Sequence, residues 1–203
     1  MDHRPIGVFD SGLGGLTAVR ELMQLLPRED IIYFGDTARV PYGVRSPETI
    51  LKFARQDMNF LCSYDLKAVV IACGTVSTTS LSTLRREYHL PIIGVVEPTA
   101  AQAARVTRSG RIGLIATAAS IRSGAYEKKI AARRPGATVY GKACPLFVPL
   151  VENGRFQMGD PVIETIAREY LQSMQEADVD TLILGCTHYP LLSDVIRHIM
   201  GPD

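Results

Sequence analysis

Residues 68–75 read Ala-Val-Val-Ile-Ala-Cys-Gly-Thr, an apolar run that ends abruptly in a cysteine and two small residues. A continuous apolar run of this length is typical of a strand that is covered on both faces, as in a parallel sheet. Residues 181–188, Thr-Leu-Ile-Leu-Gly-Cys-Thr-His, repeat the pattern, so that Cys186 follows Cys73 by 113 residues. Both runs therefore predict buried strands that end in a thiol.

Short apolar runs alternate with helical patterns on both sides of residues 68–75. The predicted strands are 6–9, 31–34, 68–72, 92–96, 112–116 and 181–186. The predicted helices are 16–26, 48–61 and 80–88. Ser46 is the expected N-cap of the second helix, with Pro47 at its first position. This alternation indicates βαβ units and a mostly parallel sheet.

The pattern restarts halfway along the chain. Residues 112–116 (IGLIA) echo residues 6–9 (IGVF), and both runs lead into small polar residues and a helix. We therefore predict an α/β fold of two similar, pseudo-symmetric domains, 1–97 and 98–203, with mostly parallel sheets and a site in the cleft between them. The alternative explanation is that parallel strands resemble one another in any α/β protein.

Composition excludes several classes of protein. The 203 residues are 46% hydrophobic, which is ordinary for a folded domain and excludes wholesale disorder. A net charge of +1 argues against a nucleic-acid or membrane-surface binder, because such binding depends on clustered cations. No transmembrane helix or signal-peptide core is predicted. Four widely spaced cysteines do not make a disulfide scaffold, so we expect a cytoplasmic protein with reduced thiols.

Four polar clusters follow predicted strands. They are Asp10-Ser11-Gly12, Asp36-Thr37 through Pro41-Tyr42-Gly43, Cys73-Gly74-Thr75 and Cys186-Thr187-His188. In open α/β sheets, ligands bind beyond the carboxyl ends of the strands. If the two halves face each other, Cys73 and Cys186 approach one cleft from opposite sides.

The four cysteines divide into two pairs. Cys62 and Cys144 are predicted to be small apolar side chains of the interior, the usual state of a free cysteine. Cys73 and Cys186 sit at matching strand ends, where a helix N-terminus can lower the pKa of a thiol. Two facing thiols suit the inversion of a carbon that bears an acidic hydrogen, since one removes a proton and the other returns one.

Two neighbours of these thiols have alternative roles. His188 could exchange a proton with Cys186, or it could be a satisfied structural histidine. Asp10 could poise Cys73, or it could cap its own loop as in an Asx turn.

Other signals are weaker. The glycines of residues 12–16 fail the dinucleotide fingerprint, because its third glycine would fall at Thr17. They are expected instead to let backbone N–H groups approach a small anion. No metal site is predicted, because Cys186-x-His188 alone is poor support for zinc.

Six ordered segments together resemble the glutamate racemases of the aspartate/glutamate racemase family. They are IGVFDSGLGGLTAVRE, IIYFGDTARVPYGVRSPETI, VVIACGTVS, IIGVVEP, CPLFVPLVENG and LILGCTHYPLL, and they extend from Ile6 to Leu192. Aspartate racemases are similar in fold and cysteine pair, but PYG and GCTHYPLL favour the glutamate enzymes.

The resemblance implies a cofactor-independent racemase that interconverts L- and D-glutamate and supplies D-glutamate for peptidoglycan. It implies that Cys73 acts on the D enantiomer and Cys186 on the L enantiomer. It also implies that Asp10, Glu152 and His188 assist proton transfer. The substrate contacts it implies are Asp10, Ser11, Tyr42, Gly43, Gly74, Thr75, Thr187 and His188. We expect a homodimer.

The sequence departs from the family pattern in two places. The usual family motif is C-N-T, whereas this chain has Cys73-Gly74-Thr75, so an asparagine donor to the substrate is replaced by backbone. The chain ends at Asp203, and the family's C-terminal return to the first domain is expected to be missing.

Three alternatives to glutamate racemisation stay open at this stage. One is a racemase of aspartate or another amino acid, and another is a truncated, non-catalytic glutamate-binding or regulatory protein. A redox thiol protein is the third, although the sequence has no C-x-x-C.

Overall fold

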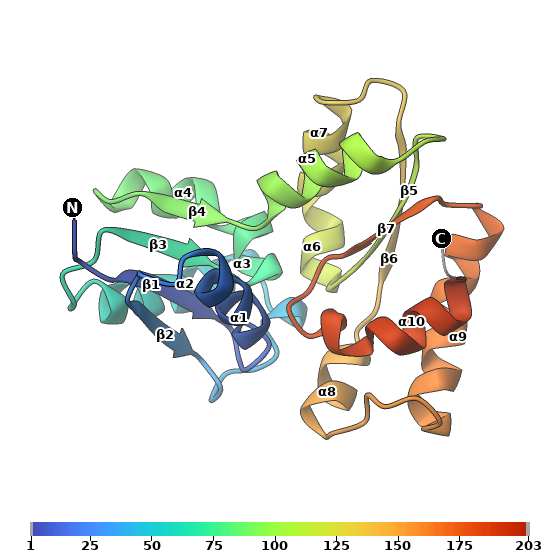
Figure 1. The fold of residues 1–203 in the computed structure, drawn as a ribbon, viewed down its shortest axis with the longest axis horizontal. Helices are drawn as coiled ribbons and strands as arrows, with labels where there is room; N and C mark the ends of the chain where they lie inside the picture. The colour runs from blue at the N-terminus through green and yellow to red at the C-terminus, as the bar shows by residue number, and fades with distance from the viewer. Residues whose placement is uncertain (1, 202–203) are drawn as a thin grey trace.

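The computed structural model describes residues 2–201, which form two lobes with a parallel sheet in each (Figure 1). The strand order is β2-β1-β3-β4 in the first lobe and β6-β5-β7 in the second, and every neighbouring pair is parallel. The predicted α/β class with parallel sheets is confirmed. Strand β3 lies beside β1 in the first sheet, and β7 lies beside β5 in the second. The two strands that precede Cys73 and Cys186 are similar in sequence, and they therefore also occupy matching positions in their sheets.

Of the seven strands within residues 2–201, six lie close to the predicted ranges, and the strand at 138–143 was not predicted. Their bounds are β1 Ile6–Asp10, β2 Ile31–Gly35, β3 Ala68–Ile71, β4 Ile92–Gly94, β5 Arg111–Ala116, β6 Thr138–Ala143 and β7 Thr181–Leu184. The α-helices are α1 Leu16–Leu25, α2 Pro47–Leu61, α3 Gly74–Thr79, α4 Leu81–Glu87, α5 Val96–Val106, α6 Ala118–Ser123, α7 Ala125–Ala131, α8 Phe147–Glu152, α9 Pro161–Glu176 and α10 Ser193–Met200. Short 3₁₀ turns cover Tyr42–Val44 (η1) and Tyr189–Leu192 (η2).

Helix α2 begins where its sequence signals predict. Ser46 is the N-cap, and its hydroxyl accepts a hydrogen bond from the Thr49 amide at 3.3 Å. Pro47 occupies the first turn, where a missing N–H costs nothing. The buried residues of the helix recur at helical spacing and face the first sheet: Ile50, Ala54, Asp57, Met58 and Leu61. Asp57 is the one carboxylate among them.

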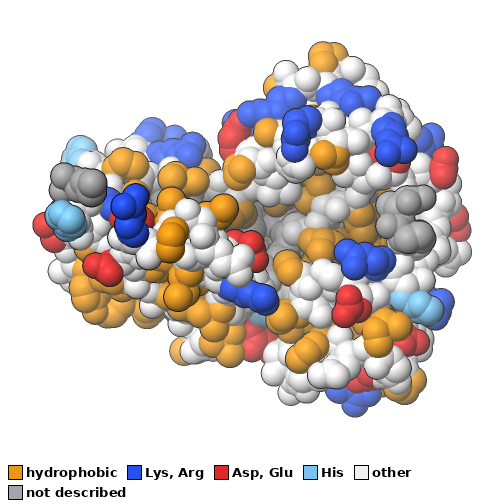
Figure 2. All heavy atoms as spheres, viewed as in Figure 1, with side chains coloured by type: hydrophobic (Ala, Val, Ile, Leu, Met, Phe, Trp, Pro, Cys, Tyr) orange, Lys and Arg blue, Asp and Glu red, His pale blue; other side chains and the backbone are white. Residues whose placement is uncertain are grey.

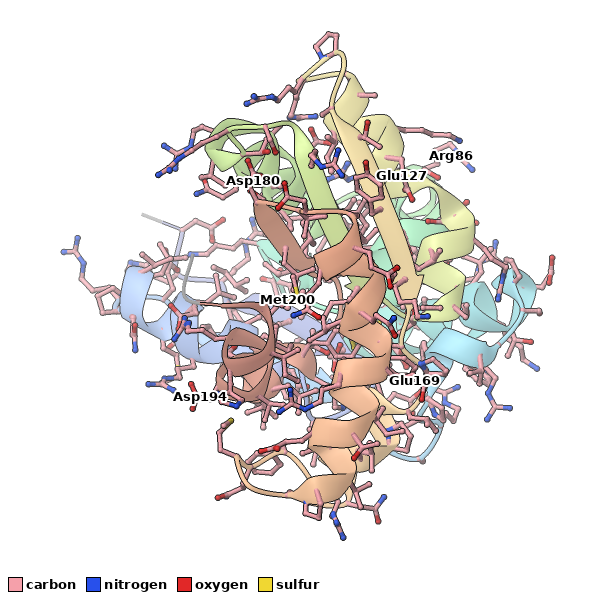
Figure 3. All side chains as sticks on the ribbon, turned by 90° about the vertical axis from the view of Figure 1, so that its right-hand side faces the viewer. Arg86, Glu127, Glu169, Asp180, Asp194 and Met200 are labelled. Carbon is pink, nitrogen blue, oxygen red and sulfur yellow. The ribbon has the colours of Figure 1, made fainter. Side chains whose placement is uncertain are left out.

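The second sheet is covered on both faces by helices. Alternate residues of a strand point to opposite faces. Ile115 and Leu184 therefore pack with α8, α9 and α10, whereas Leu114 and Ile183 pack with α5 and α7. In Figure 3, α9 and α10 lie in front of this sheet, with Glu169 on α9 and Asp194 and Met200 on α10 labelled. Burial on both faces explains the continuous apolar runs of β5 and β7.

Within residues 2–201, the chain passes from the first lobe to the second once, between β4 and α5. The predicted strand 92–96 is too long, because β4 ends at Gly94 and Val96 already belongs to α5. The chain is helical rather than extended from Val96 because Val96, Ala100 and Ala103 bury one apolar face against the second lobe. The domain boundary after Glu97 stays a prediction, close to the start of this helix.

Helix α1 is the least covered element of the first lobe. None of its ten residues is buried. Large apolar side chains are exposed on it and beside it: Leu13, Leu16, Met23, Leu25 and Leu26. Figure 2 shows hydrophobic atoms gathered over this part of the first lobe. Among the described residues, no helix is both long and apolar enough to span a bilayer.

Candidate active site

The carboxyl ends of the strands in both lobes meet at one small cavity. Its volume is about 20 Å³, the space of about one water molecule. Nine of the ten predicted substrate-site residues line it: Ser11, Tyr42, Gly43, Cys73, Gly74, Thr75, Cys186, Thr187 and His188. The first lobe supplies Cys73 and the second supplies Cys186, so both thiols border the same space.

Cys73 follows β3 and is the N-cap residue of α3. Its side chain is buried, and Sγ lies 3.4 Å from the Ser11 hydroxyl. Burial, together with the smaller effect of the negative charge of Asp10, raises the pKa of the Cys73 thiol to about 12. The prediction of a lowered pKa at this strand end is therefore wrong, because lost hydration outweighs the helix N-terminus.

Cys186 follows β7 and has an imidazole beside it. Its Sγ lies 3.8 Å from Nδ1 of His188, and Nε2 of His188 lies 2.5 Å from a Glu152 carboxylate oxygen. Burial raises the pKa of Cys186 above its usual range, and the backbone N–H of His188 opposes that shift. The Glu152 side chain is 27% exposed, so the three groups form a chain from the cavity toward solvent.

Asp10 is fully buried behind the cavity wall. Its carboxylate accepts hydrogen bonds from the Gly12 and Gly15 amides at 3.2 and 2.9 Å, and from the Thr187 hydroxyl at 3.3 Å. Burial raises the pKa of Asp10, and the positive charge of a protonated His188 would lower it. The loop-capping alternative therefore describes its hydrogen bonds, while its charge acts on both thiols from a distance.

The glycines after β1 admit side chains of the other lobe. A Cβ on Gly14 would lie 2.6 Å from the Thr187 hydroxyl and 2.7 Å from Nδ1 of His188. On Gly15 it would lie 2.4 Å from Cβ of Asp10. These contacts are closer than atoms can approach, so close packing requires glycine here. The amides of Gly12 and Gly15, which were expected to approach a small anion, donate to the Asp10 carboxylate.

A pair of threonines joins the lobes at the cavity. The hydroxyls of Thr75 and Thr117 lie 2.9 Å apart, and Gly43 packs against Thr117 so closely that a Cβ would lie 2.4 Å from the threonine Cβ. Thr117 follows β5 and caps α6 through the Ser120 amide. Sequence reasoning missed Thr117, although its position after a strand was a usable signal. It also missed the apolar lining residue Val148, whereas Val40 and Pro41 lie within the predicted segment 36–43.

Gly74 lies where the backbones of the two lobes come close together. A Cβ placed on it would lie 2.5 Å from the Gly185 carbonyl oxygen and 3.9 Å from Cα of Cys186. Both contacts involve backbone, which cannot rotate away as a side chain can. Gly74, which stands where the family motif has asparagine, therefore lies at a tight contact between the two cysteine-bearing loops.

The other two cysteines lie away from the cavity. Cys144 is fully buried in the second lobe, as expected. Cys62 is exposed at the C-terminal end of α2, so the prediction of a buried apolar role is wrong there. The helix turns its apolar face inward one residue earlier, at Leu61, which leaves Cys62 on the solvent side.

We expect alkylation to separate Cys62 from the cavity thiols. Iodoacetamide at pH 7.5 should label Cys62 first, because only the exposed thiolate reacts readily and burial keeps Cys73 and Cys186 protonated. The labelling rate of Cys73 should climb about tenfold per pH unit without levelling below pH 10, since its pKa is about 12. Peptide mass spectrometry measures both, and a Cys73 that reacts as fast as Cys62 at pH 7.5 would contradict the burial argument.

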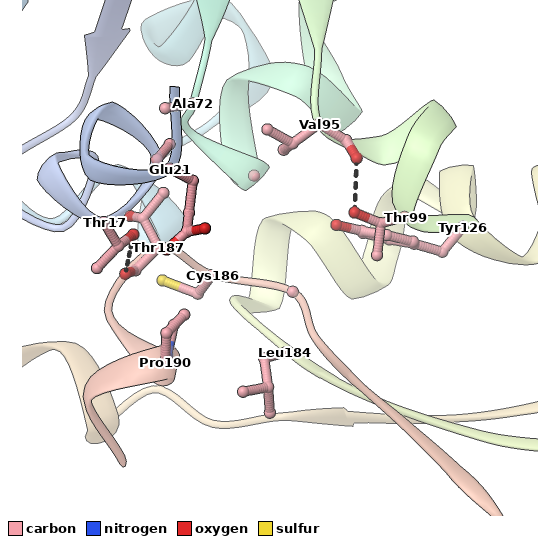
Figure 4. Close-up of a pocket in the computed structure, with 13 residues that line it drawn as sticks. Thr17, Glu21, Ala72, Val95, Thr99, Tyr126, Leu184, Cys186, Thr187 and Pro190 are labelled. Atoms are coloured by element: carbon pink, nitrogen blue, oxygen red, sulfur yellow. Dashed lines mark hydrogen bonds between the residues drawn. The ribbon is translucent and has the colours of Figure 1, made fainter. Parts of the chain in front are cut away.

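A second cavity of about 280 Å³, larger than the first, is lined by Gly74, Gly185, Cys186 and Thr187 among others (Figure 4). Cys186 and Thr187 border both cavities. Thr17 donates to the Thr187 carbonyl at 3.4 Å, so α1 is tied to the end of β7. Within residues 2–201, no cluster of three His, Cys, Asp or Glu side chains could hold a metal ion.

Comparison with known proteins identifies this arrangement. The sequence profile described as Asp/Glu/Hydantoin racemase matches residues 6–202. A glutamate racemase of Geobacter metallireducens is 50% identical over all 203 residues, which cover 74% of that protein.

Solved structures agree with the sequence comparison. The crystal structure of a glutamate racemase isoform from Bacillus anthracis superposes with a TM-score of 0.93 at 40% identity, covering 99% of this chain and 75% of that one. A glutamate racemase from Francisella tularensis, solved in complex with D-glutamate, gives 0.91 at 43% identity and covers 98% and 74%. This chain therefore spans about three quarters of the proteins that it resembles.

Proposed function

Because the chain belongs to the Asp/Glu/hydantoin racemase family, we propose that it interconverts L- and D-glutamate at the cavity between its lobes. The observation that carries the proposal is the pair of thiols, one from each lobe, at the border of a single cavity. Glutamate is the substrate because relatives with this activity are about half identical, and one was solved with D-glutamate bound.

The proposed reaction moves one proton off the α-carbon and one onto it. A thiolate at Cys186 removes the Cα hydrogen of L-glutamate and becomes a thiol, and the Cys73 thiol gives its proton to the opposite face and becomes a thiolate. The D-to-L direction uses the same groups with their roles exchanged. No cofactor takes part in this scheme, because the electron pair left on Cα is taken up by the new C–H bond.

The raised pKa values of the two thiols support this chemistry. A buried thiolate is a stronger base than a hydrated one, and the Cα hydrogen of an amino acid is a weak acid. A raised pKa also means that few thiolates exist at neutral pH, so another group must first accept the proton of the thiol. The chain from Cys186 through His188 to Glu152 offers that path, with Nδ1 3.8 Å from the sulfur.

Polar groups around the cavity would hold the two carboxylates of the substrate. Ser11, Thr75 and Thr187, which carry hydroxyls, line it together with Tyr42 and Gly43. Preorganised donors of this kind stabilise the negative charge that develops on the substrate as the proton leaves. The present cavity holds about one water, so substrate entry requires the lobes to separate and close again.

A racemisation assay on this 203-residue chain tests the proposal. L- and D-glutamate should each be converted toward an equal mixture, followed by circular dichroism, with solvent deuterium incorporated at Cα. Aspartate is shorter by one methylene, so it should be at least about tenfold poorer in kcat/KM. Faster turnover of aspartate would favour the alternative amino-acid racemase, and tight D-glutamate binding without turnover would favour a non-catalytic binding protein.

The cellular setting follows from the same proposal. D-glutamate made by this chain would supply peptidoglycan synthesis in the cytoplasm, and the enzyme would act as a homodimer. Detection of the dimer by light scattering, with and without D-glutamate, is the direct measurement.

A further inference from the structure

Helix α2 carries a carboxylate that the proposed reaction does not use. Asp57 is fully buried on the helix face that packs against the first sheet. A buried carboxylate is costly unless it is paired and hydrogen-bonded, so its partners identify what it does. Its partners are Tyr42 and Arg39, both from the loop that follows β2.

Two acidic groups share one hydroxyl in this cluster. The Tyr42 hydroxyl contacts an oxygen of Asp36 and, at 2.9 Å, an oxygen of Asp57. A tyrosine hydroxyl has one hydrogen and can donate to one of them. Both contacts are satisfied when one carboxyl is protonated and donates to the tyrosine oxygen. The cluster therefore has a place for one extra proton.

Arg39 closes the cluster from the solvent side. Its guanidinium lies 2.5 Å from Asp36 and 2.9 Å from Asp57, so one cation faces two carboxyl groups. It also lies over the Phe53 ring, 4.4 Å from the ring centre, which holds its side chain against α2. With both carboxyl groups ionised, the cluster has a net negative charge, and with one protonated it is neutral.

The cluster ends at the cavity. Tyr42 is 1% exposed, and Pro41, Tyr42 and Gly43 line the space between the thiols. Gly43 is pressed against Thr117 of the other lobe. The hydroxyl of Tyr42 is thus held at α2, while the segment 41–43 forms part of the cavity wall.

We propose that Asp57 is a positioning residue for substrate binding, which acts through Tyr42 and Arg39 to hold the segment 41–43 against the cavity. The proposal rests on the proposed function, since it assigns that segment to glutamate. Asp57 does not line the cavity, and it acts on a segment that does.

The charge state of the cluster gives the proposal a pH dependence. Burial raises the pKa of Asp57 to about 7, a hydrogen bond from Tyr42 and the charge of Arg39 oppose the rise, and the charges of Asp36 and Asp10 add to it. Below pH 7 the proton satisfies the Tyr42 contacts. Above pH 7 the ionised cluster repels itself and the anionic substrate, so KM for glutamate should rise between pH 6 and 8.

Two variants of Asp57 test the assignment, with Glu48→Gln as the matched control. Glu48 is an exposed carboxylate in the first turn of the same helix. Asp57→Leu should raise KM for both enantiomers about tenfold while kcat stays within about threefold. Asp57→Asn keeps a donor to Tyr42 at every pH, so its KM should match the parent at pH 6 and lose the rise toward pH 8.

The outcomes separate positioning from a general structural role. A folded Asp57→Leu with unchanged KM would overturn the proposal, and so would a fall in kcat alone. If Asp57→Leu does not fold, Asp57→Asn decides, because a KM that still rises with pH as in the parent chain also overturns the assignment.

Hydrogen exchange distinguishes failure of this inference from failure of the proposed function. If the parent chain does not racemise or bind glutamate, the proposed function fails. The cluster is then read from the backbone amides of residues 39–45, which should exchange faster in Asp57→Leu than in the parent chain or Glu48→Gln. Unchanged exchange there overturns the positioning role whether or not the cavity is an active site.

Discussion

Replacing either Cys73 or Cys186 by alanine is expected to lower glutamate racemisation by about 10³-fold in both directions. Each direction needs a base on one face and an acid on the other, and a positioned proton-transfer group is typically worth 10²- to 10⁴-fold. Steady-state rates from L- and from D-glutamate, followed by circular dichroism, measure the loss. Neither thiol can replace the other, because they come from opposite lobes.

Solvent-deuterium exchange shows which face each thiol serves. Cys73→Ala retains the base for L-glutamate, so any residual exchange without inversion should be confined to that enantiomer, and Cys186→Ala should show the reverse. Cys62→Ala is the control, because that thiol is exposed and distant from the cavity, and its rates should stay within about twofold. A single alanine variant that still racemises fully would exclude the two-base scheme.

Gly74→Val should have the second-largest effect, a fall of about 10²-fold in kcat/KM. Its Cβ would overlap the Gly185 carbonyl, 2.5 Å away, so the cysteine-bearing loops must move apart. A misplacement of about 1 Å in a reacting geometry can cost about 10²-fold. Overpacking also destabilises by about 1–3 kcal/mol, so rates are compared well below the unfolding midpoint, which chemical denaturation measures.

Gly141→Ala is the matched control for this substitution. Gly141 lies on β6, and a Cβ there would make ordinary contacts, the nearest at 3.4 Å to Ile121. Its activity should equal that of the parent chain. Gly74→Ala should fall between the parent and Gly74→Val. Equal activity of all three variants would mean that the loops adjust freely and that the close contact has no functional weight.

Within residues 2–201, six strands and the helices α1, α2 and α4 could be predicted from periodicity, whereas no range was predicted for β6 or the other seven α-helices. The apolar runs of β3 and β5 have no polar face to confuse the pattern, and Ser46-Pro47 marks the start of α2. The sequence failed at β4, because a continuous apolar segment does not show where a strand becomes a helix. What decides that point is the packing of α5 on the other lobe, which involves residues distant in sequence.

The residues of the candidate site were predictable from the sequence, but their burial and the resulting pKa shifts were not. The rule that ligands meet strand ends brought together Cys73 and Cys186. The direction of their pKa shifts depends on burial by the opposite lobe, which no local motif encodes. Asp57 and Thr117 escaped notice for the same reason, since their partners lie in other elements.

The small volume of the cavity sets a condition on the proposed catalytic cycle. Glutamate has ten heavy atoms and cannot fit where one water fits, so under the proposed function the lobes must open and close as a gate in each turnover. The rate at which this gate opens and closes then sets an upper limit on how fast the two enantiomers can equilibrate, whatever the rate of proton transfer.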